Sequence, residues 1–441
     1  MKKRRFAIVG TGARVTMFLD PLVSRFRDSS ELVGMCDASP TRMDFHLRRI
    51  ATEYSAPPVP KYSPQGFEQM IQTEKPHYVI VCTPDASHHD YIIRALDQGV
   101  DVISEKPLTT DSLKCQAIFE AVRRTGRSVR TTFNSRWMPG PTRIREIILS
   151  GVIGKIKQVQ FEYMLNTSHG ADYFRRWHSQ KEVSGGLLIH KSTHHFDLIN
   201  WWIDAIPEKV YATGGLVFYG RANAVARGLE SFTRYERYTG EIEAKNDPFR
   251  LDLEADPRLH ALYKQAEVES GYIRDRNVFR DNINIEDLMS VMVNYRNGVT
   301  ANYSLNAFSP VEGLNVSITG DKGRLEYSDR KTLPSLKEGS NPADFISLQK
   351  NLKVIPHLGE AYVVPIEKRS GGHDGSDSLI QEQIFGSNPP EEHLGRNAGH
   401  EQGAASLLIG AAANRSMETG LPVRVDDLLQ LGSVDSFAEL I

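Results

Sequence analysis

The first 130 residues alternate short apolar runs with amphipathic stretches, and this alternation restricts the fold more than any other feature of the chain. The apolar runs carry few charges, which predicts strands that are buried on both faces. The stretches between them have the spacing of helices. Strands of this kind, connected by helices, form a parallel sheet covered on both sides. The expected strands are residues 6–9, 32–36, 77–82, 100–104 and 128–133, and the expected helices lie near 13–27, 87–98 and 113–125.

A different pattern begins after residue 130. Residues 155–163 alternate apolar and polar side chains, which predicts a strand with one exposed face. We therefore predict an α/β domain in residues 1–130 and, in residues 131–441, an α+β domain built on a large, mostly antiparallel sheet. Residues 219–285 are charged and weakly periodic and are interpreted as a partly helical insertion, and residues 331–371 are interpreted as rich in loops. Further strands are expected near 208–218, 289–295, 298–305, 313–319 and 323–327, and helices near 141–150 and 400–419.

The composition excludes several classes of partner. The 441 residues include 53 basic and 55 acidic side chains, a net charge of −2. A nucleic-acid or membrane-surface partner would require a strong basic excess. No apolar run approaches the ~20 residues of a membrane span, and the run after the basic N-terminus is too short for a signal peptide. We expect a cytoplasmic protein in which Cys36, Cys82 and Cys115 are buried free thiols.

Glycines mark the turn after the first strand. Gly10 and Gly12 stand where the chain enters the first helix, an arrangement that brings backbone N–H groups close to a pyrophosphate. Val15 replaces the third glycine of the dinucleotide-binding motif. Asp37 follows the second strand, where a carboxylate would accept hydrogen bonds from the ribose of NAD and repel the 2′-phosphate of NADP. Arg42 could bind that phosphate, and a simple turn at Asp37 is a further alternative. We expect a Rossmann-like domain that binds NAD in preference to NADP.

Two further segments follow expected strands at the edge of the sheet where ligands bind in folds of this class. Thr83-Pro84 ends one strand, and Glu105-Lys106-Pro107 ends the next. The proline stiffens its turn, and Lys106 would project toward the nicotinamide. A desolvated lysine there can polarise or protonate an oxygen on the carbon that exchanges hydride. A surface Lys-Pro turn is the alternative interpretation.

Residues 184–197 hold the densest group of reactive side chains. His190, His194 and Asp197 have the spacing i, i+4 and i+7, so they would share one face of a helix. Such a face can transfer protons or hold a metal ion. Because proton transfer needs no third ligand, we predict that no metal is bound.

Together these segments resemble the Gfo/Idh/MocA family, the glucose–fructose oxidoreductase and inositol dehydrogenase-like proteins. The resemblance covers nearly the whole chain. It implies an N-terminal domain that binds NAD(P) and an open-faced C-terminal sheet that mediates dimers or tetramers. The residues that carry it are Gly10-x-Gly12-x-Arg14, Asp37, Thr83-Pro84 with His88, Glu105-Lys106-Pro107, Asn134 with Arg136, Gly151 to Lys155, Gly185 to Asp197, and Ala413 to Pro422.

The resemblance also implies roles for individual residues. Lys106 takes the place of the active-site lysine, and His194 that of the histidine that acts as acid or base. His190 stands where the family has an aspartate, so we expect the proton balance or the substrate to differ. The residues expected to contact the cofactor are Gly10, Thr11, Gly12, Ala13, Arg14, Asp37, Arg42, Thr83, Pro84, His88, Glu105, Lys106 and Asn134. Those expected to contact substrate are Tyr173, Arg176, Trp177, Lys191, Asp197 and His373. A structural pair at the domain seam is the alternative for Arg176 and Trp177.

We therefore predict an NAD(P)-dependent oxidoreductase that transfers hydride to or from a hydroxyl-bearing carbon of a sugar, glycoside or polyol. Lys106 and His194 would share the proton transfer, assisted by His190. One alternative is NAD-dependent glycoside cleavage or epimerisation through a keto intermediate, with no net redox change. The other is a non-catalytic NAD-binding regulator. We expect a homodimer or homotetramer that assembles through the C-terminal sheet.

Overall fold

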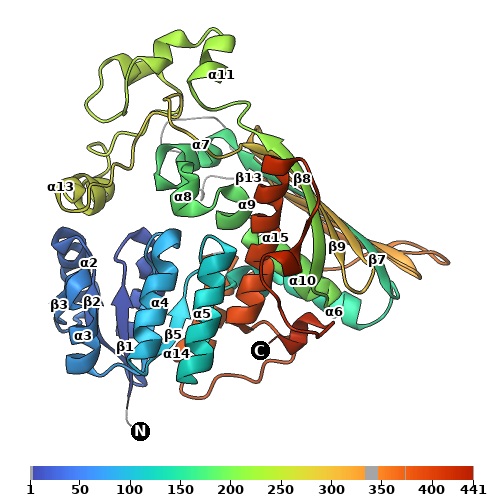
Figure 1. Ribbon diagram of the computed structural model, residues 1–441, viewed down its shortest axis with the longest axis horizontal. Coiled ribbons are helices and arrows are strands. Elements are labelled where there is room, and N and C mark those ends of the chain that lie inside the picture. The colour runs from blue at the N-terminus through green and yellow to red at the C-terminus, as the bar shows by residue number, and fades with distance from the viewer. Residues whose placement is uncertain (1–2, 333–345, 373, 441) are drawn as a thin grey trace.

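The computed structural model describes residues 3–332, 346–372 and 374–440. Within this part the chain forms two sheets, each with its own helices, which lie next to each other (Figure 1). The first sheet is made mainly by the N-terminal residues, and the second by residues after 150. Both predicted fold classes are confirmed.

The first sheet has the strand order β15-β6-β5-β4-β1-β2-β3 in the described part of the chain. All neighbouring strands are parallel except β15, which is antiparallel to β6. Ala7 and Val9 of β1 belong to one apolar core, and Phe6 and Ile8 to another, so the strand is buried on both faces. The strands are β1 (Arg4–Val9), β2 (Ser30–Cys36), β3 (Lys61–Tyr62), β4 (Tyr78–Val81), β5 (Asp101–Ser104), β6 (Val129–Thr131) and β15 (Ala398–Gly399).

Helices cover both faces of this sheet (Figure 1). One core includes side chains of α3, α4 and α5, and the other includes side chains of α1, α2 and α14. The helices are α1 (Thr16–Val23), α2 (Pro40–Tyr54), α3 (Phe67–Glu74), α4 (His88–Asp97), α5 (Ser112–Thr125) and α14 (Ser376–Phe385). Because α14 and β15 come from the C-terminal part of the chain, residues 1–130 do not complete this sheet alone.

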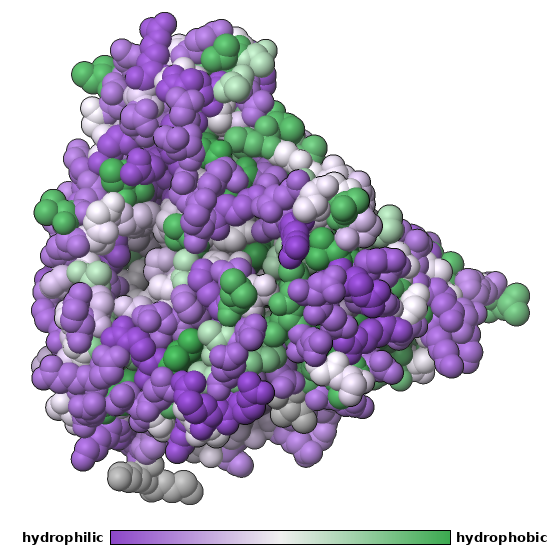
Figure 2. Space-filling view, in the orientation of Figure 1, coloured by the Kyte–Doolittle hydropathy of each residue, from purple (hydrophilic) through white to green (hydrophobic). Residues whose placement is uncertain are grey.

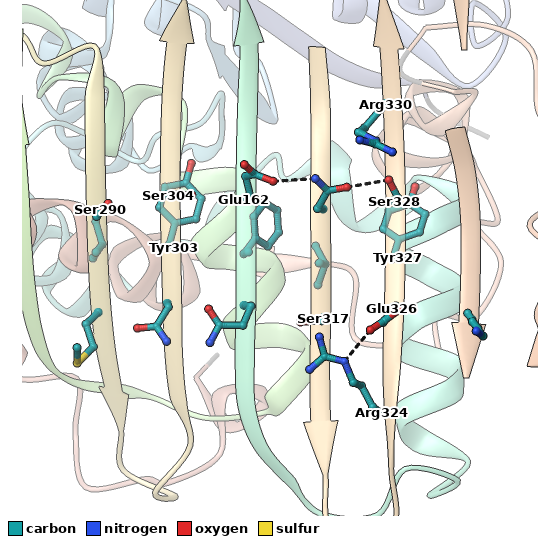
Figure 3. A pocket seen from close by; sticks show the side chains of 18 of the residues that line it. Glu162, Ser290, Tyr303, Ser304, Ser317, Arg324, Glu326, Tyr327, Ser328 and Arg330 are labelled. Carbon is teal, nitrogen blue, oxygen red and sulfur yellow. Dashed lines mark hydrogen bonds and ion pairs between the residues drawn. The ribbon is translucent and has the colours of Figure 1, made fainter. Parts of the chain in front are cut away.

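The second sheet has the order β14-β13-β12-β11-β7-β10-β9-β8-β16 in the described residues. Its neighbours are antiparallel except β7 and β10, which are parallel. Along β10, buried side chains alternate with half-exposed ones. One face packs against helices, and the other is open (Figure 3). The strands are β7 (Ile156–Asn166), β8 (Pro207–Gly215), β9 (Leu288–Tyr295), β10 (Thr300–Ser309), β11 (Glu312–Gly320), β12 (Gly323–Thr332), β13 (Ile346–Pro356), β14 (Tyr362–Val363) and β16 (Val423–Arg424).

In the second domain, α15 packs against both α10 and β8. The long helix predicted over 400–419 is confirmed as α15. The helices are α6 (Pro139–Leu149), α7 (Thr167–Arg175), α8 (Lys181–Ser184), α9 (Leu187–His190), α10 (Thr193–Ile203), α11 (Arg221–Ala226), α12 (Pro257–Leu259), α13 (Glu267–Ser270) and α15 (His400–Thr419).

The prediction that residues 331–371 are rich in loops is wrong for β13 and β14, and it is not tested at residues 333–345, which lie outside the described part of the chain. β13 pairs with β12 over most of its length, and β14 pairs with β13. The apolar alternation of β13 is interrupted by the polar residues 349–351, which hides the strand in the sequence. Leu352 and Val354 of β13 are fully buried. Pairing with β12 therefore stabilises β13, although the sequence of β13 shows only part of the alternation expected for a strand.

Residues 219–285, called the insertion below, lie over the first domain. They contain α11, α12 and α13 and little other regular structure. Leu262 and Tyr263 pack against Ala13 and Phe45 of the first domain. In Figure 1, α13 stands above α2, and Figure 2 shows the surface hollowed between the insertion and the first domain. The insertion therefore adjoins the edge of the first sheet at which β2 ends.

Candidate active site

Lys106 lies just after β5 and faces the second domain. Its ammonium nitrogen donates a hydrogen bond of 2.7 Å to the backbone oxygen of His190, at the end of α9. The turn Glu105–Pro107 that carries it includes a cis Lys106–Pro107 peptide bond. Gly185 and Gly186 have φ values of +71° and +79°, which turn the chain from α8 into α9. The two domains thus meet at the side chain of Lys106.

The side chains of Asp85 and His190 also meet across the domains. Nδ1 of His190 lies 2.6 Å from Oδ2 of Asp85, and the two side chains are 14% and 4% exposed. Asp85 comes directly after Thr83-Pro84, beyond the end of β4. The sequence places Asp85 after Thr83-Pro84 but indicates no partner for it, because 105 residues separate it from His190. Its place after a parallel strand next to β5 is the signal that could have identified it.

Burial sets the protonation of these three groups. It raises the pKa of Asp85 well above its usual value, against the effect of Lys106, and it lowers the pKa of His190 well below its usual value. Both shifts favour the uncharged forms, which are a protonated Asp85 and a neutral His190. Burial also lowers the pKa of Lys106 to about 8, although Asp85 acts to raise it. Lys106, His190 and Asp85, called the proton-transfer cluster below, can exchange protons near neutral pH.

Aromatic rings enclose His190 on the side of the second domain. The ring centroids of His178, Trp177 and Tyr173 lie 4.2, 5.5 and 5.6 Å from the centroid of His190. His178 is buried, and its Nδ1 has no hydrogen-bond partner among the described residues. Burial lowers the pKa of His178 well below its usual value, so the ring is neutral. Rings with polar edges can pack against a ring-shaped ligand and also hydrogen-bond to it.

The prediction that His190, His194 and Asp197 share one helical face is wrong. α9 ends at His190, and α10 begins at Thr193. The backbone N–H groups of residues 191 and 192 both donate to the oxygen of Leu187, which closes α9 and separates it from α10. The spacing i, i+4 and i+7 aligns side chains only in a continuous helix.

Asp197 faces the protein interior. Its carboxylate accepts hydrogen bonds of 2.8 and 2.6 Å from Nε and Nη2 of Arg136, and both side chains are 0% exposed. The prediction that Asp197 contacts substrate is therefore wrong, because this buried bidentate pair occupies its carboxylate. His195 is also in the core, where its Nδ1 lies 2.8 Å from the hydroxyl of Tyr303.

His194 and Lys191 remain candidates. His194 is half-buried, and its ring centroid lies 6.1 Å from that of Phe133. The ammonium of Lys191 lies 5.2 Å from the ring centroid of Tyr163. Burial lowers the pKa of Lys191, with Glu312 opposing the shift. The role of His194 in proton transfer stays a prediction, and so does the role of Lys191 in substrate binding.

The turn after β1 has the geometry of a dinucleotide-binding loop. Gly10 has a φ of +87°, and a Cβ there would lie 2.6 Å from backbone atoms of both Cys82 and Thr83. Only glycine fits this close approach of two strand ends. The hydroxyl oxygen of Thr83 is buried and has no hydrogen-bond partner among the described residues. An unsatisfied hydroxyl beside the glycine turn suits a bound polar ligand.

Hydrogen-bond groups at the same turn also fit a dinucleotide. Oδ2 of Asp37 accepts bonds of 2.5 and 2.8 Å from the amide and the hydroxyl of Thr11. The amide of Ala13 donates a bond of 3.0 Å to the hydroxyl of Tyr263, from the insertion. An amide at the start of the first helix is where a pyrophosphate oxygen binds in Rossmann domains, and a carboxylate after β2 is where the ribose binds.

Arg14 and Arg42 are both held by carboxylates. Nε of Arg14 lies 2.7 Å from Oε1 of Glu105, which links the glycine turn to the turn that carries Lys106. Nη1 of Arg42 lies 4.0 Å from Oδ1 of Asp37. These arginines therefore lie at the same edge of the sheet as the residues expected to contact the cofactor.

His88 and Asn134 hold loops in place. The ring nitrogens of His88 lie 2.8 and 2.9 Å from the backbone oxygens of Pro107 and Thr83. The amide of Asn134 donates a bond of 3.0 Å to Asp377. Both side chains are 1% exposed, and their contact with the cofactor stays a prediction. Their hydrogen bonds fix the turns on which the other candidates lie.

The remaining predicted substrate-binding residues lie next to the insertion or outside the residues that the structure describes. Nη1 of Arg176 lies 2.9 Å from Asp172, and its Nε donates a bond of 3.3 Å to the hydroxyl of Tyr272. Arg176 thus joins the second domain to the insertion. The ring of Trp177 stacks on the adjacent His178 at 3.7 Å. His373 lies outside the described residues.

Three general features of the chain bear on its chemistry. In residues 3–332, 346–372 and 374–440, no group of three or more His, Cys, Asp or Glu side chains is arranged to hold a metal ion. None of the helices described is both long and apolar enough to cross a membrane. Cys36, Cys82 and Cys115 are free thiols, as predicted, but Cys82 is only half-buried.

Two family models match the chain. One is described as "Oxidoreductase family, NAD-binding Rossmann fold" and matches residues 4–133. The other, "Oxidoreductase family, C-terminal alpha/beta domain", matches residues 145–425. The first match covers β1 to β6, and the second covers most of the second sheet.

Individual proteins agree with these matches. YteT of Bacillus subtilis, whose name describes it as an oxidoreductase, is 32% identical over 435 residues, 95% of this chain and 97% of that protein. An inositol 2-dehydrogenase of Rubrobacter xylanophilus is 24% identical over 213 residues, 47% of this chain and 54% of that protein. The solved structure of the WlbA dehydrogenase from Bordetella pertussis, in complex with NADH and UDP-GlcNAcA, has the same fold. Its TM-score is 0.62 at 17% identity, over 96% of this chain and 99% of that one.

One family assignment accounts for the Rossmann domain with its glycine turn, for the open second sheet and for the full-length similarity to YteT. The chain belongs to the Gfo/Idh/MocA family of oxidoreductases.

Proposed function

We propose that this protein is an NAD-dependent oxidoreductase that transfers hydride to or from a hydroxyl-bearing carbon of a sugar, glycoside or polyol. The observation that carries the proposal is the meeting of Lys106, His190 and Asp85 beyond the ends of β4 and β5. Ligands of a Rossmann sheet bind at this edge. Oxidation of an alcohol releases a proton together with the hydride, and the proton-transfer cluster can receive it.

When bound, NAD supplies the hydride acceptor, and the chain supplies the proton chemistry. Lys106, whose pKa is lowered to about 8, takes the proton of the substrate hydroxyl in oxidation and returns it in reduction. Its bond to the backbone oxygen of His190 fixes the nitrogen between the domains. Asp85 orients the His190 ring through Nδ1, which leaves Nε2 as a second proton acceptor or donor. His194 is a further candidate for this role.

The groups around the cluster support a polyhydroxylated substrate. Tyr173 and Trp177 provide aromatic faces beside His190. His169 and Glu312, whose Nδ1 and Oε1 atoms lie 2.9 Å apart, add polar groups next to Tyr173. Apolar faces combined with charged hydrogen-bonding groups suit a ring that carries several hydroxyls. The similarity to an inositol 2-dehydrogenase is consistent with such a ring.

Asp37 supports NAD over NADP. It lies directly after β2 and is only 9% exposed. A carboxylate there can accept hydrogen bonds from ribose hydroxyls but repels a 2′-phosphate. We propose NAD as the cofactor on this ground.

The proposal is tested by incubating the purified protein with NAD and a panel of sugars, polyols and glycosides. Reduced cofactor is followed by absorbance, and the products are identified. We expect net reduction of NAD without bond cleavage. Cleavage or epimerisation without net reduction would support the route through a keto intermediate instead. Binding of NAD with no turnover of any member of the panel would contradict the proposal and favour a regulator.

We also propose that a second copy of the chain covers the open face of the second sheet. Polar side chains point outward from this face and line a shallow cavity of about 890 Å³ (Figure 3). Glu162, Asn315 and Ser328 form two hydrogen bonds of 2.7 Å across three strands. Tyr211 and Met292, on neighbouring strands, are 42% and 46% exposed. A broad, ordered face that mixes polar and apolar groups suits a two-fold interface.

A further inference from the structure

The insertion places a carboxylate directly beyond the end of β2. Glu269, on α13, accepts hydrogen bonds of 2.7 Å from the hydroxyl and 3.1 Å from the amide of Thr41. The hydroxyl of Ser39 donates a third, short bond to it. Ser39 is also the N-cap of α2, where its hydroxyl accepts a bond from the amide of Arg42. The carboxylate is thus held by side chains and backbone of the first turn of α2.

These donors form an anion site beside the expected ribose position. Hydroxyls, an amide and a guanidinium at the start of a helix after β2 are the groups that bind a 2′-phosphate in Rossmann domains. Asp37, two residues before Ser39, marks the ribose position in the same domains. In this protein the anion that occupies the site is Glu269, which is supplied by the chain itself.

The insertion also holds Arg42, whose guanidinium could favour NADP. Nη2 of Arg42 donates a bond of 3.0 Å to the hydroxyl of Ser270, and Nε donates one of 3.3 Å to the backbone oxygen of Leu262. Its guanidinium carbon lies 5.6 and 5.7 Å from the ring centroids of Tyr263 and Tyr272. Nε and Nη2 of Arg42 are therefore directed into the insertion, while Nη1 lies near Asp37.

We infer that Glu269 selects NAD over NADP, because its carboxylate occupies the place where a 2′-phosphate would bind. This inference rests on the proposed function, since it requires a dinucleotide in the first domain. NADP would have to displace a bound carboxylate and then lie close to it and to Asp37, and like charges in contact are strongly unfavourable. NAD has a hydroxyl at this position and meets no such repulsion. The insertion thus provides a specificity residue that the β2 segment alone does not contain.

The test measures cofactor binding directly. Dissociation constants for NADH and NADPH are determined by fluorescence titration and calorimetry for the full chain and for Glu269→Gln, Glu269→Lys and Glu243→Gln. Glu243 is an exposed residue on the same insertion, so its variant is a control for loss of one negative charge. Circular dichroism and thermal unfolding verify that each variant is folded. If Glu269→Gln is unstable, Glu269→Lys still tests the inference.

The expected results are specific. Wild-type protein binds NADH more tightly than NADPH, and Glu269→Gln tightens NADPH binding by about tenfold while NADH changes by less than about twofold. Glu269→Lys shifts the ratio further, and Glu243→Gln leaves it unchanged. An unchanged ratio in both Glu269 variants overturns the inference but leaves the proposed function intact. Equal binding of the two cofactors by wild type overturns the inference and the proposed preference for NAD, but it leaves the proposed hydride transfer intact. Binding of neither cofactor by wild type overturns the proposed function, and this inference with it.

Discussion

His190 stands where the family resemblance implies an aspartate, and Asp85 of the first domain supplies a carboxylate to it at 2.6 Å. The carboxyl group expected at this position therefore comes from another part of the chain. Because one member of the pair lies on each domain, the pair exists only when the domains are packed together. The proton-transfer cluster thus depends on residue identity and on domain packing at once.

Replacing Asp85 by Asn tests the pair. The amide keeps the size of the side chain but cannot exchange a proton with His190, so we expect kcat to fall by roughly 100-fold. Affinity for NADH should change by less than about twofold. Steady-state kinetics and fluorescence titration measure the two quantities. Asp90→Asn is the matched control, since Asp90 lies nearby on α4 but is 54% exposed. An unchanged kcat in Asp85→Asn would show that the pair has no part in turnover.

Lys106 should determine the pH profile of the reaction. Burial lowers its pKa to about 8, and the charged groups near it include Asp85, Glu105, Lys191 and Arg14. A lysine that accepts the substrate proton is active when neutral, so the rate of alcohol oxidation should rise with pH through about 8, and the rate of the reverse reduction should fall. Lys106→Arg stays protonated and should remove this limb, and Lys106→Ala should lower kcat by about 10² to 10⁴. If Lys106→Ala turns over like wild type, Lys106 is not catalytic.

At the scale of elements, the break between α9 and α10 divides the histidine segment into two functions. His190, at the end of α9, faces the first domain. Asp197, on α10, faces inward to Arg136. A single continuous helix could not direct both side chains in these ways, so the interruption at residues 191–192 separates a site residue from a residue that stabilises the core.

The pair of Arg136 and Asp197 should contribute strongly to stability. Asp197→Asn leaves a buried guanidinium without its counter-charge, although Gly395 and Gln402 still accept bonds from it. We expect the free energy of unfolding to fall by roughly 3–5 kcal/mol. Urea titration followed by circular dichroism measures this change. Glu146→Gln, which breaks a pair whose side chains are 40–43% exposed, should cost less than about 1 kcal/mol. Equal losses in the two variants would contradict the argument.

Elements with a strong local pattern were predictable from the sequence. Hydrophobic periodicity or turn and stop residues in the sequence mark the buried parallel strands, the glycine turn and α15. β13 does not, because polar residues interrupt its alternation and its burial depends on pairing with β12. The contact between Asp85 and His190 and the contact between Glu269 and Thr41 depend on packing between segments more than 100 and 200 residues apart. Contacts between residues so far apart in the sequence leave no local pattern from which they could be predicted.

At the scale of the whole molecule, the open face of the second sheet should determine the oligomeric state. We expect the 49.5 kDa chain to elute as a dimer or tetramer, measured by light scattering coupled to size exclusion. Introducing glutamates at Asn302 and Ser304, which lie half-exposed on β10, should convert it to monomers with an unchanged circular dichroism spectrum. The same change at exposed Leu113 on α5 is the control and should leave the mass unaltered. A wild-type monomer at micromolar concentration would contradict the proposed interface.

The antiparallel pairing of β15 with β6 has a consequence for any attempt to isolate the cofactor-binding half. A fragment that ends near residue 130 would lack the edge strand at residues 398–399 and the helix at 376–385 that cover this side of the sheet. It would present the unpaired backbone of β6 and the apolar surface beneath α14 to solvent. Such edges recruit strands from other molecules. A truncated fragment should therefore aggregate, and the unit that evolution can duplicate, exchange or fuse in this protein is the whole chain rather than its first sheet.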